Sequence, residues 1–234
     1  MRTSVLSVTL LLLFMPFSLF AADPAIGVSE FRNDTSAGWW YGGVGRELAG
    51  MLSNELAATG KFRVVDREKL DRVLAEQDLS DAGRVNKATR VKSGKLTGAK
   101  YLVFATVTAF EENTSGGDGG VSFRGIRVGG KKQEAYIAVD LRVVDTTTGD
   151  IEFVRTVEAR SEAKGMRLGL YRGGFGGNLA KHEKTPAGKA IRGVVLEIAD
   201  YLTCAMVDQD DCMNEYDSKE KSRRDKTKRS IKLD

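Results

Sequence analysis

The chain has 234 residues, of which 41% are hydrophobic and 29% charged, and its formal net charge is +4. This length suffices for one domain with a sizeable core. The mild charge excludes a strongly acidic or strongly basic protein. Beyond the N-terminus no apolar stretch is long enough for a membrane-spanning helix, so none is expected in the mature chain.

Residues 1–22 have the features of a secretory signal peptide. Arg2 gives a positive start, residues 5–20 form an apolar core, and Ala21 and Ala22 supply small residues for cleavage. A retained membrane anchor is the alternative. No cysteine lies in this region, so we expect an exported protein that is not lipid-anchored through an N-terminal cysteine.

Short strands and helices alternate in the next part of the chain. Residues 25–31 and 61–65 are apolar runs typical of strands. Apolar residues at helical spacing predict a helix over residues 44–59, with Gly60 as its stop. Asp66 is expected to cap a second helix. The buried face of that second helix is expected to hold Leu70, Val73 and Leu74.

Three consecutive aromatic residues, Trp39, Trp40 and Tyr41, lie between glycines in the loop before the first helix. Neighbouring residues of a strand or helix point in different directions, so three such rings cannot all face one core. We expect at least one of them to be exposed or used at an interface. Packing of all three against the domain's own surface is the alternative.

The stretch over residues 99–158 reads as three strands. Residues 101–109 are apolar on both faces, as expected of a central strand. Residues 135–144 alternate between apolar and polar, and a tight turn leads to residues 151–157, which predicts a hairpin. The polar, glycine-rich excursion between the first two strands is unusual for a compact domain. A second glycine-rich stretch follows at residues 168–177.

A final helix is expected from Thr185 and Pro186 to about residue 206. Residues 213–234 are almost wholly charged and are expected to form a disordered basic tail. Together these elements predict an α/β (α+β) fold, in which helices pack on a mixed sheet over residues 23–212.

The two cysteines, Cys204 and Cys212, lie close together near the end of that domain. In an oxidising compartment they could form a disulfide, and two free thiols are the alternative. A metal site is not expected, because two cysteines and the distant His182 cannot supply four ligands. No cofactor is expected.

No catalytic motif is present. Gly188 and Lys189 lack the upstream glycine and the following Ser or Thr of a phosphate-binding loop. No G-x-S-x-G turn occurs, and His182 is the only histidine. Nucleic-acid binding is disfavoured, because the core elements do not interleave basic and aromatic residues. The chain is therefore not expected to be an enzyme.

Several segments together resemble the curli production assembly/transport component family, the CsgG-like proteins of the bacterial outer membrane. The most specific are TGAKYLVFATVT at residues 97–108 and IAVDLRVVDTTTGDI at residues 137–151. AIGVSEF at residues 25–31 and TPAGKAI at residues 185–191 also match. The resemblance spans roughly residues 25–207.

The resemblance implies a periplasmic domain that assembles into a homo-oligomeric ring. Each subunit would contribute two hairpin extensions, at about residues 111–135 and 157–184, to one large transmembrane β-barrel. The loop at residues 33–43 would narrow the channel, which makes Trp39, Trp40 and Tyr41 candidates for the pore constriction. The candidate residues of the membrane hairpins are Val121, Phe123, Ile126, Val128, Val157, Ala159, Leu168 and Leu170.

The resemblance implies a non-enzymatic channel or assembly factor for the export of amyloid fibre subunits, with the outer membrane and accessory assembly proteins as further partners. The second hairpin departs from this pattern, because Val157, Ala159 and Ser161 are smaller than the apolar face that a membrane strand needs. The alternative is a soluble periplasmic scaffold or binding protein that uses the same domain without forming a pore.

Overall fold

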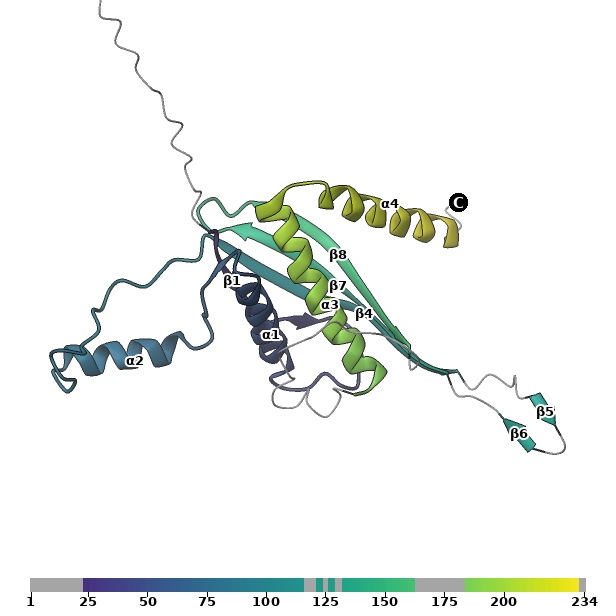
Figure 1. Cartoon of the computed structure of the whole chain (residues 1–234), viewed down its shortest axis with the longest axis horizontal. Coiled ribbons are helices and arrows are strands. Elements are labelled where there is room, and N and C mark those ends of the chain that lie inside the picture. The colour runs from purple at the N-terminus through teal and green to yellow at the C-terminus, as the bar shows by residue number, and fades with distance from the viewer. Residues whose placement is uncertain (1–22, 116–120, 124–125, 129–131, 163–183, 232–234) are drawn as a thin grey trace, which may run out of the picture.

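The computed structural model describes residues 23–115, 121–123, 126–128, 132–162 and 184–231. A mixed sheet carries two helices on one face, and the central strands run on beyond the helices (Figure 1). The mixed α/β fold that the sequence predicts is confirmed. The elements are β1 (Ala25–Val28), β2 (Arg32–Asn33), α1 (Val44–Thr59), β3 (Arg63–Val64), α2 (Leu70–Asp81), β4 (Tyr101–Ser115), β5 (Val121–Phe123), β6 (Ile126–Val128), β7 (Lys132–Asp145), β8 (Ile151–Glu162), α3 (Pro186–Thr203), a π-helical turn (Cys204–Asp208) and α4 (Cys212–Ser230).

The sheet has the order β3–β1–β4–β7–β8, and β2 pairs with β4. β1 is parallel to β3 and β4, whereas β4, β7 and β8 form an antiparallel meander. Gly149 has a φ of 81° in the turn between β7 and β8. The backbone N–H of Thr147 donates a 2.7 Å hydrogen bond to the Asp145 carboxylate there. The turn is therefore stabilised by a hydrogen bond to one of its own side chains.

The core lies between one face of the sheet and helices α1 and α3. The inward side chains of β7 alternate along the strand as the sequence predicts. Burying an aliphatic side chain of this kind stabilises the fold by about 1.5–3 kcal/mol. The buried core residues of β7 and α3 include Ile137, Val139, Leu141, Val143, Ile191, Val194, Val195, Ile198 and Leu202.

Helix α1 approaches the sheet closely at Gly45. A Cβ built there would overlap the carbonyl oxygen of Phe31. The Phe31 backbone N–H donates a 3.1 Å hydrogen bond to the Gly45 carbonyl. The helix begins after Gly43 and ends at Gly60, both with positive φ. The absence of a side chain at Gly45 therefore lets the helix sit directly against the backbone between β1 and β2.

Helix α2 departs from the sequence prediction. Val73 and Leu74 are exposed, at 44% and 39%, where a buried face was expected. In Figure 1 the helix lies away from the sheet. Asp66 accepts hydrogen bonds from the N–H groups of Glu68 and Lys69 just before the helix. The expected burial is wrong because helical periodicity identifies an apolar face without showing that the same chain covers it.

The charged C-terminal stretch forms helix α4, so the expectation of a disordered tail over residues 213–234 is wrong for the described residues. Ion pairs one turn apart support the helix. Lys219 pairs with Glu215 at 3.0 Å, and Arg223 pairs with Glu220 at 2.7 Å. Lys228 and Arg229 occupy the last turn, where cations interact favourably with the helix dipole. No helix of the described residues has the length and apolar composition needed to cross a bilayer.

Candidate functional site at the root of the strand extension

The first predicted excursion, at residues 111–135, contains paired strands in its described part. Glu111 pairs with Tyr136 and Ser115 with Lys132. Strand β8 stays paired with β7 as far as Glu134 and Glu162, and beyond that point β4 and β7 continue as a two-stranded ribbon. Further out, β5 and β6 pair in antiparallel fashion. Figure 1 shows the ribbon projecting from the domain. Contact of the membrane with Val121, Phe123, Ile126 and Val128 stays a prediction.

Most of the second predicted hairpin, at about residues 157–184, lies outside the described residues, and its first residues belong to β8. Val157 is buried, and Ala159 packs against α3 at Gly193. The Ser161 hydroxyl donates a 2.7 Å hydrogen bond to the Pro186 carbonyl. The assignment of Val157 and Ala159 to a membrane hairpin is therefore wrong, because β8 keeps the same alternation through the sheet and periodicity alone does not mark its end. Leu168 and Leu170 lie outside the described residues.

The aromatic loop packs where β4 leaves the core. Trp39 is 3% exposed and lies edge-on against Trp40 and Phe110, with ring centroids 5.5 and 5.4 Å away. Because Trp39 belongs to the subunit core, its assignment to a pore constriction is wrong. Trp40 and Tyr41 are half-buried against the core, so none of the three rings is exposed. The constriction role of Trp40 and Tyr41 stays a prediction.

Hydrogen bonds fasten this loop to β4. β2 pairs with β4 at Thr106 and Val107, and the Asp34 N–H donates to the Val107 carbonyl. The Asn33 carboxamide oxygen accepts from both the N–H and the hydroxyl of Thr35. The register of β4 then shifts between Val107 and Ala109. A bulge bends a strand and changes the direction of its side chains. The aromatic loop is therefore attached to β4 directly before this bend.

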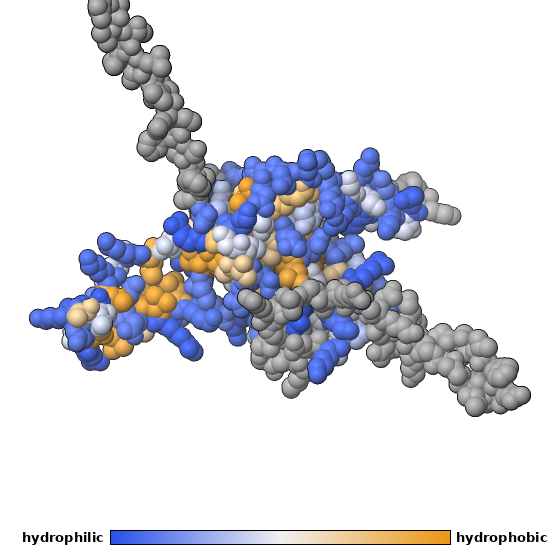
Figure 2. Space-filling model, in the orientation of Figure 1, coloured by the Kyte–Doolittle hydropathy of each residue, from blue (hydrophilic) through white to orange (hydrophobic). Residues whose placement is uncertain are grey.

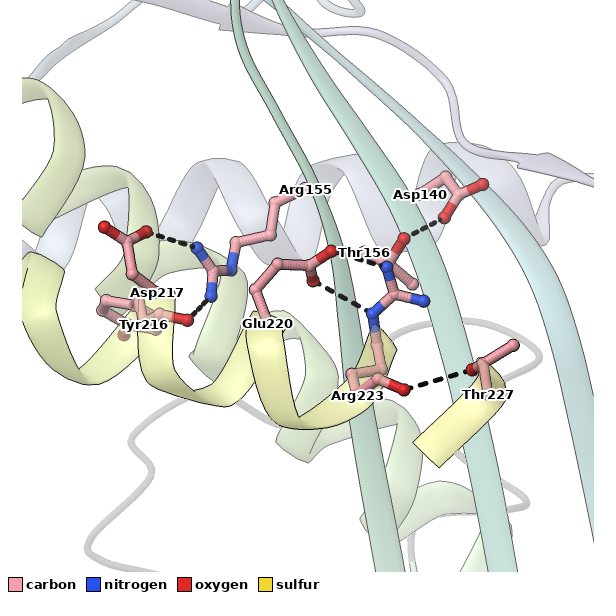
Figure 3. Close-up of polar contacts among 8 residues, drawn as sticks. All are labelled: Asp140, Arg155, Thr156, Tyr216, Asp217, Glu220, Arg223 and Thr227. Carbon is pink, nitrogen blue, oxygen red and sulfur yellow. Dashed lines mark hydrogen bonds and ion pairs between the residues drawn. The ribbon is translucent and has the colours of Figure 1, made fainter. Parts of the chain in front are cut away.

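A second attachment holds α4 against strand β8 (Figure 3). Arg155 of β8 has a side chain that is only 8% exposed. Its guanidinium donates to the Tyr216 carbonyl, pairs with Asp217 at 3.7 Å, and stacks on the rings of Tyr201 and Tyr216. Burial raises the pKa of Tyr216 to about 12. The sequence analysis missed Arg155, although an arginine in the inward phase of a buried strand is a detectable signal.

Further along the same strand the contacts remain polar. Thr156 donates a 2.8 Å hydrogen bond to Asp140, and Glu220 accepts two bonds from Arg223. These bonds lower the pKa of the Glu220 carboxyl. The cavity between β8 and α4 is lined by charges of both signs, in Arg155, Thr156, Val157, Glu158, Glu197, Tyr216, Lys219, Glu220 and Arg223. This arrangement anchors a helix along the edge strand.

Cys204 and Cys212 are bonded to one another just before α4, with Cα atoms 6.1 Å apart. In the described part of the chain, the one grouping with metal-ligand spacing is Cys204, Asp210 and Cys212. Both thiols are consumed by the disulfide, so the group does not offer thiolates to an ion. The bond instead fixes the point where α4 begins.

The described residues define an α/β domain whose central strands continue beyond its core. The chain belongs to the family described as "Curli production assembly/transport component CsgG", whose model matches residues 17–231. This is a family of secretion and assembly components and not a class of enzymes.

The chain is 30% identical over 112 residues to the curli production assembly/transport component CsgG of Escherichia coli (strain K12) and of Salmonella typhimurium (strain LT2). The match covers 46% of this chain and 40% of each relative. Among solved structures, the hypothetical protein CT253 from Chlamydia trachomatis has a TM-score of 0.47 at 13% identity, over 80% of this chain and 99% of that one. The PelC dodecamer from Paraburkholderia phytofirmans has a TM-score of 0.36 at 14% identity, over 75% and 84%.

Proposed function

We propose that this chain is a subunit of a non-enzymatic curli-type secretion or assembly component. In this proposal several copies form a ring at the outer membrane and export amyloid fibre subunits. The observation that carries the proposal is the β4–β7 ribbon, whose strands stay paired beyond the last β7–β8 pair, Glu134 and Glu162, as far as Ser115 and Lys132. An exposed two-stranded ribbon is marginal on its own, so partner strands from neighbouring copies would stabilise it.

The other parts of the site have supporting roles in the proposal. The loop with Trp40 and Tyr41 would face the secreted chain at the root of the ribbon. The disulfide between Cys204 and Cys212 fits an oxidising compartment such as the periplasm. Fibre subunits and accessory assembly proteins are the proposed partners besides further copies of this chain, and nucleic acid is not among them.

A second candidate function is a soluble periplasmic scaffold built on the same domain. Burial of Val157 and contact of Ala159 with α3 favour it, because they place the first residues of the predicted second hairpin in the domain core. In this case the ribbon would be a binding arm, and no pore would form.

The experiment removes the ribbon tip from the full chain expressed with its N-terminal segment. Because Ser115 and Lys132 are cross-strand partners, an Asn-Gly turn can replace residues 116–131 and close the hairpin. The matched control replaces Thr147-Thr148 in the β7–β8 turn with Asn-Gly. Far-UV circular dichroism and thermal unfolding establish that both variants are folded.

We expect wild type and control to fractionate with outer membranes, to extract as a large oligomer, and to produce ion conductance in planar bilayers. The ribbon-tip variant should lose the conductance while keeping its fold. A wild-type protein that stays a soluble monomer without conductance would overturn the channel and favour the scaffold.

A further inference from the structure

A polar groove lies between α4 and the last paired residues of β7 and β8. It is lined by Tyr136, Glu158 and Arg160 of the sheet and by side chains of α4 between Glu215 and Ser230, and we call it the root groove. Tyr136 and Arg160 are cross-strand partners, and the Arg160 guanidinium lies over the Tyr136 ring, 4.9 Å from its centroid. Strand β8 makes its last pair with β7 just beyond them. The root groove therefore borders the start of the ribbon.

Helix α4 runs along β8 toward the ribbon. Near the start of the helix the Tyr216 ring contacts Arg155, and near its end Lys226 and Ser230 lie in the root groove with Arg160. Figure 1 shows the C-terminal end of α4 and the ribbon on the same side of the domain. If the ribbon enters a bilayer, as the proposed function requires, the end of α4 therefore lies near the membrane surface.

The side of α4 that faces the root groove carries no apolar side chain. Its members recur at the helical spacing of three and four residues, and each of them is charged or carries a hydroxyl. In the part of the chain that the structure describes, the hydroxyls of Ser218 and Ser222 have no hydrogen-bond partner. Figure 2 shows a hydrophilic surface toward the C-terminal end of α4. The groove is therefore suited to a polar ligand.

The root groove also has an excess of positive charge, because four basic side chains line it against two carboxylates. These charged residues are Arg160, Lys219, Arg223 and Lys226, with Glu158 and Glu215. In the neighbouring cavity over Arg155, three basic side chains meet three carboxylates, so the excess appears only toward the ribbon. Among the described residues, Lys226 has no ion-pair partner. The groove is therefore expected to attract an anion.

We propose that the root groove binds the phosphate headgroup of an anionic phospholipid at the bilayer surface where the ribbon enters the membrane. Arg160 and Lys226 pair with the phosphate oxygens, and the Ser222 hydroxyl donates a hydrogen bond to them. An acidic protein would also match the charge, but the position of the groove beside the ribbon favours a lipid. The inference deepens the proposed function and rests on it, because a headgroup is present at this point only if the ribbon enters a bilayer.

The first test measures headgroup binding separately from membrane insertion. It uses the ribbon-tip variant, in which Asn-Gly replaces residues 116–131, because that variant keeps every residue of the root groove. Flotation compares vesicles of phosphatidylcholine alone with vesicles of an equal mixture of phosphatidylcholine and phosphatidylglycerol. At low salt we expect the variant to bind the mixed vesicles at least about tenfold more tightly. High salt should abolish the difference, because it screens exposed charges.

The second test removes two positive charges from the root groove. In the ribbon-tip background, Arg160→Gln with Lys226→Gln should weaken binding to the mixed vesicles at least about tenfold. The matched control is Arg224→Gln with Lys228→Gln, which removes the same two kinds of charge from the opposite side of α4. The control should change binding less than about threefold, because neither residue lines the groove. All four residues are exposed, and circular dichroism verifies that each variant is folded.

The outcomes separate this inference from the proposed function. An equal loss in the groove variant and its control would overturn the inference, because the attraction would then be spread over the whole helix. A ribbon-tip variant that does not prefer phosphatidylglycerol, beside a wild type that conducts ions, would overturn the inference and leave the proposed function standing. A wild type that gives no conductance, beside a ribbon-tip variant that needs Arg160 and Lys226 to bind the mixed vesicles, would overturn the channel and support headgroup binding by the groove.

Discussion

Trp39 lies edge-on against Phe110, with their ring centroids 5.4 Å apart and their planes at 71°. Phe110 follows the register shift of β4 and pairs with Ile137 of β7, on the part of the sheet that leads into the ribbon. The pair therefore joins the aromatic loop to the root of the strand extension. Edge-to-face aromatic pairs contribute about 0.5–1.5 kcal/mol beyond the area that they bury.

Trp39→Ala should lower the free energy of unfolding by about 3–5 kcal/mol, because it removes a large buried side chain and leaves a cavity. Trp39→Phe should lose less, since it keeps an aromatic ring. Urea unfolding followed by circular dichroism measures both. Trp40→Ala is the matched control, because Trp40 is only half-buried. An equal loss at Trp39 and Trp40 would contradict the burial described here.

Gly45 and Gly50 of α1 should respond to alanine in opposite directions. Gly45→Ala would place a methyl group on the carbonyl oxygen of Phe31, so stability should fall by about 1–3 kcal/mol. At Gly50 an added Cβ meets nothing within 4 Å, so alanine should stabilise the helix by about 0.5–1 kcal/mol. Thermal unfolding of the two variants compares them directly. A stabilising Gly45→Ala would show that α1 does not approach Phe31 so closely.

The core was predictable because its signals are local. The period of two along β7 and the Thr185-Pro186 start of α3 each follow from neighbouring residues. The Thr185 hydroxyl accepts the 3.0 Å hydrogen bond from Gly188 that such a start implies. The family resemblance added the prediction that the glycine-rich stretch at residues 111–135 is an extension of two strands.

The remaining features depend on partners far apart in sequence. Arg155 donates a hydrogen bond to the carbonyl of Tyr216, which is far away in the sequence and lies beside β8 only in the folded domain. The buried position of Trp39 requires Phe110, which comes 71 residues later. The exposure of Val73 and Leu74 could not be predicted, since their apolar spacing is the same whether the cover comes from the same chain or from another.

The turn at Asp145 should make stability depend on pH in the acid range. The Thr147 backbone hydrogen bond holds the pKa of the Asp145 carboxyl below its ordinary value of 3.8. A depressed folded-state pKa contributes stability that is fully present above 3.8 and is lost as the pH falls through the folded value. The free energy of unfolding should therefore fall as the pH drops below 3.8, and Asp145→Asn should reduce that pH dependence. An unchanged slope in the variant would contradict the assignment.

The disulfide should stabilise the C-terminal part of the domain. Replacing both Cys204 and Cys212 by alanine should cost about 2–3 kcal/mol in the chain-entropy description of so short a loop. Calorimetry with and without dithiothreitol measures the effect. The reductant should lower the melting temperature of wild type and leave that of the double variant unchanged. A reductant-insensitive wild type would contradict the bond.

Arg155 should hold α4 on the sheet edge mainly through its buried stacking and its bond to the Tyr216 carbonyl. Helix α4 buries no residue fully, and its other contacts with the domain include the exposed Lys219–Glu197 ion pair and the partly buried Met213 and Tyr216. Arg155→Met should raise amide hydrogen exchange over residues 212–230 at least tenfold and leave α3 protected. Asp217→Asn should change little, because Asp217 is exposed and such pairs contribute about 0–1 kcal/mol. Lys228→Met serves as a control on the exposed end of α4. If Asp217→Asn released the helix as fully as Arg155→Met, the ion pair and not the stacking would be the anchor.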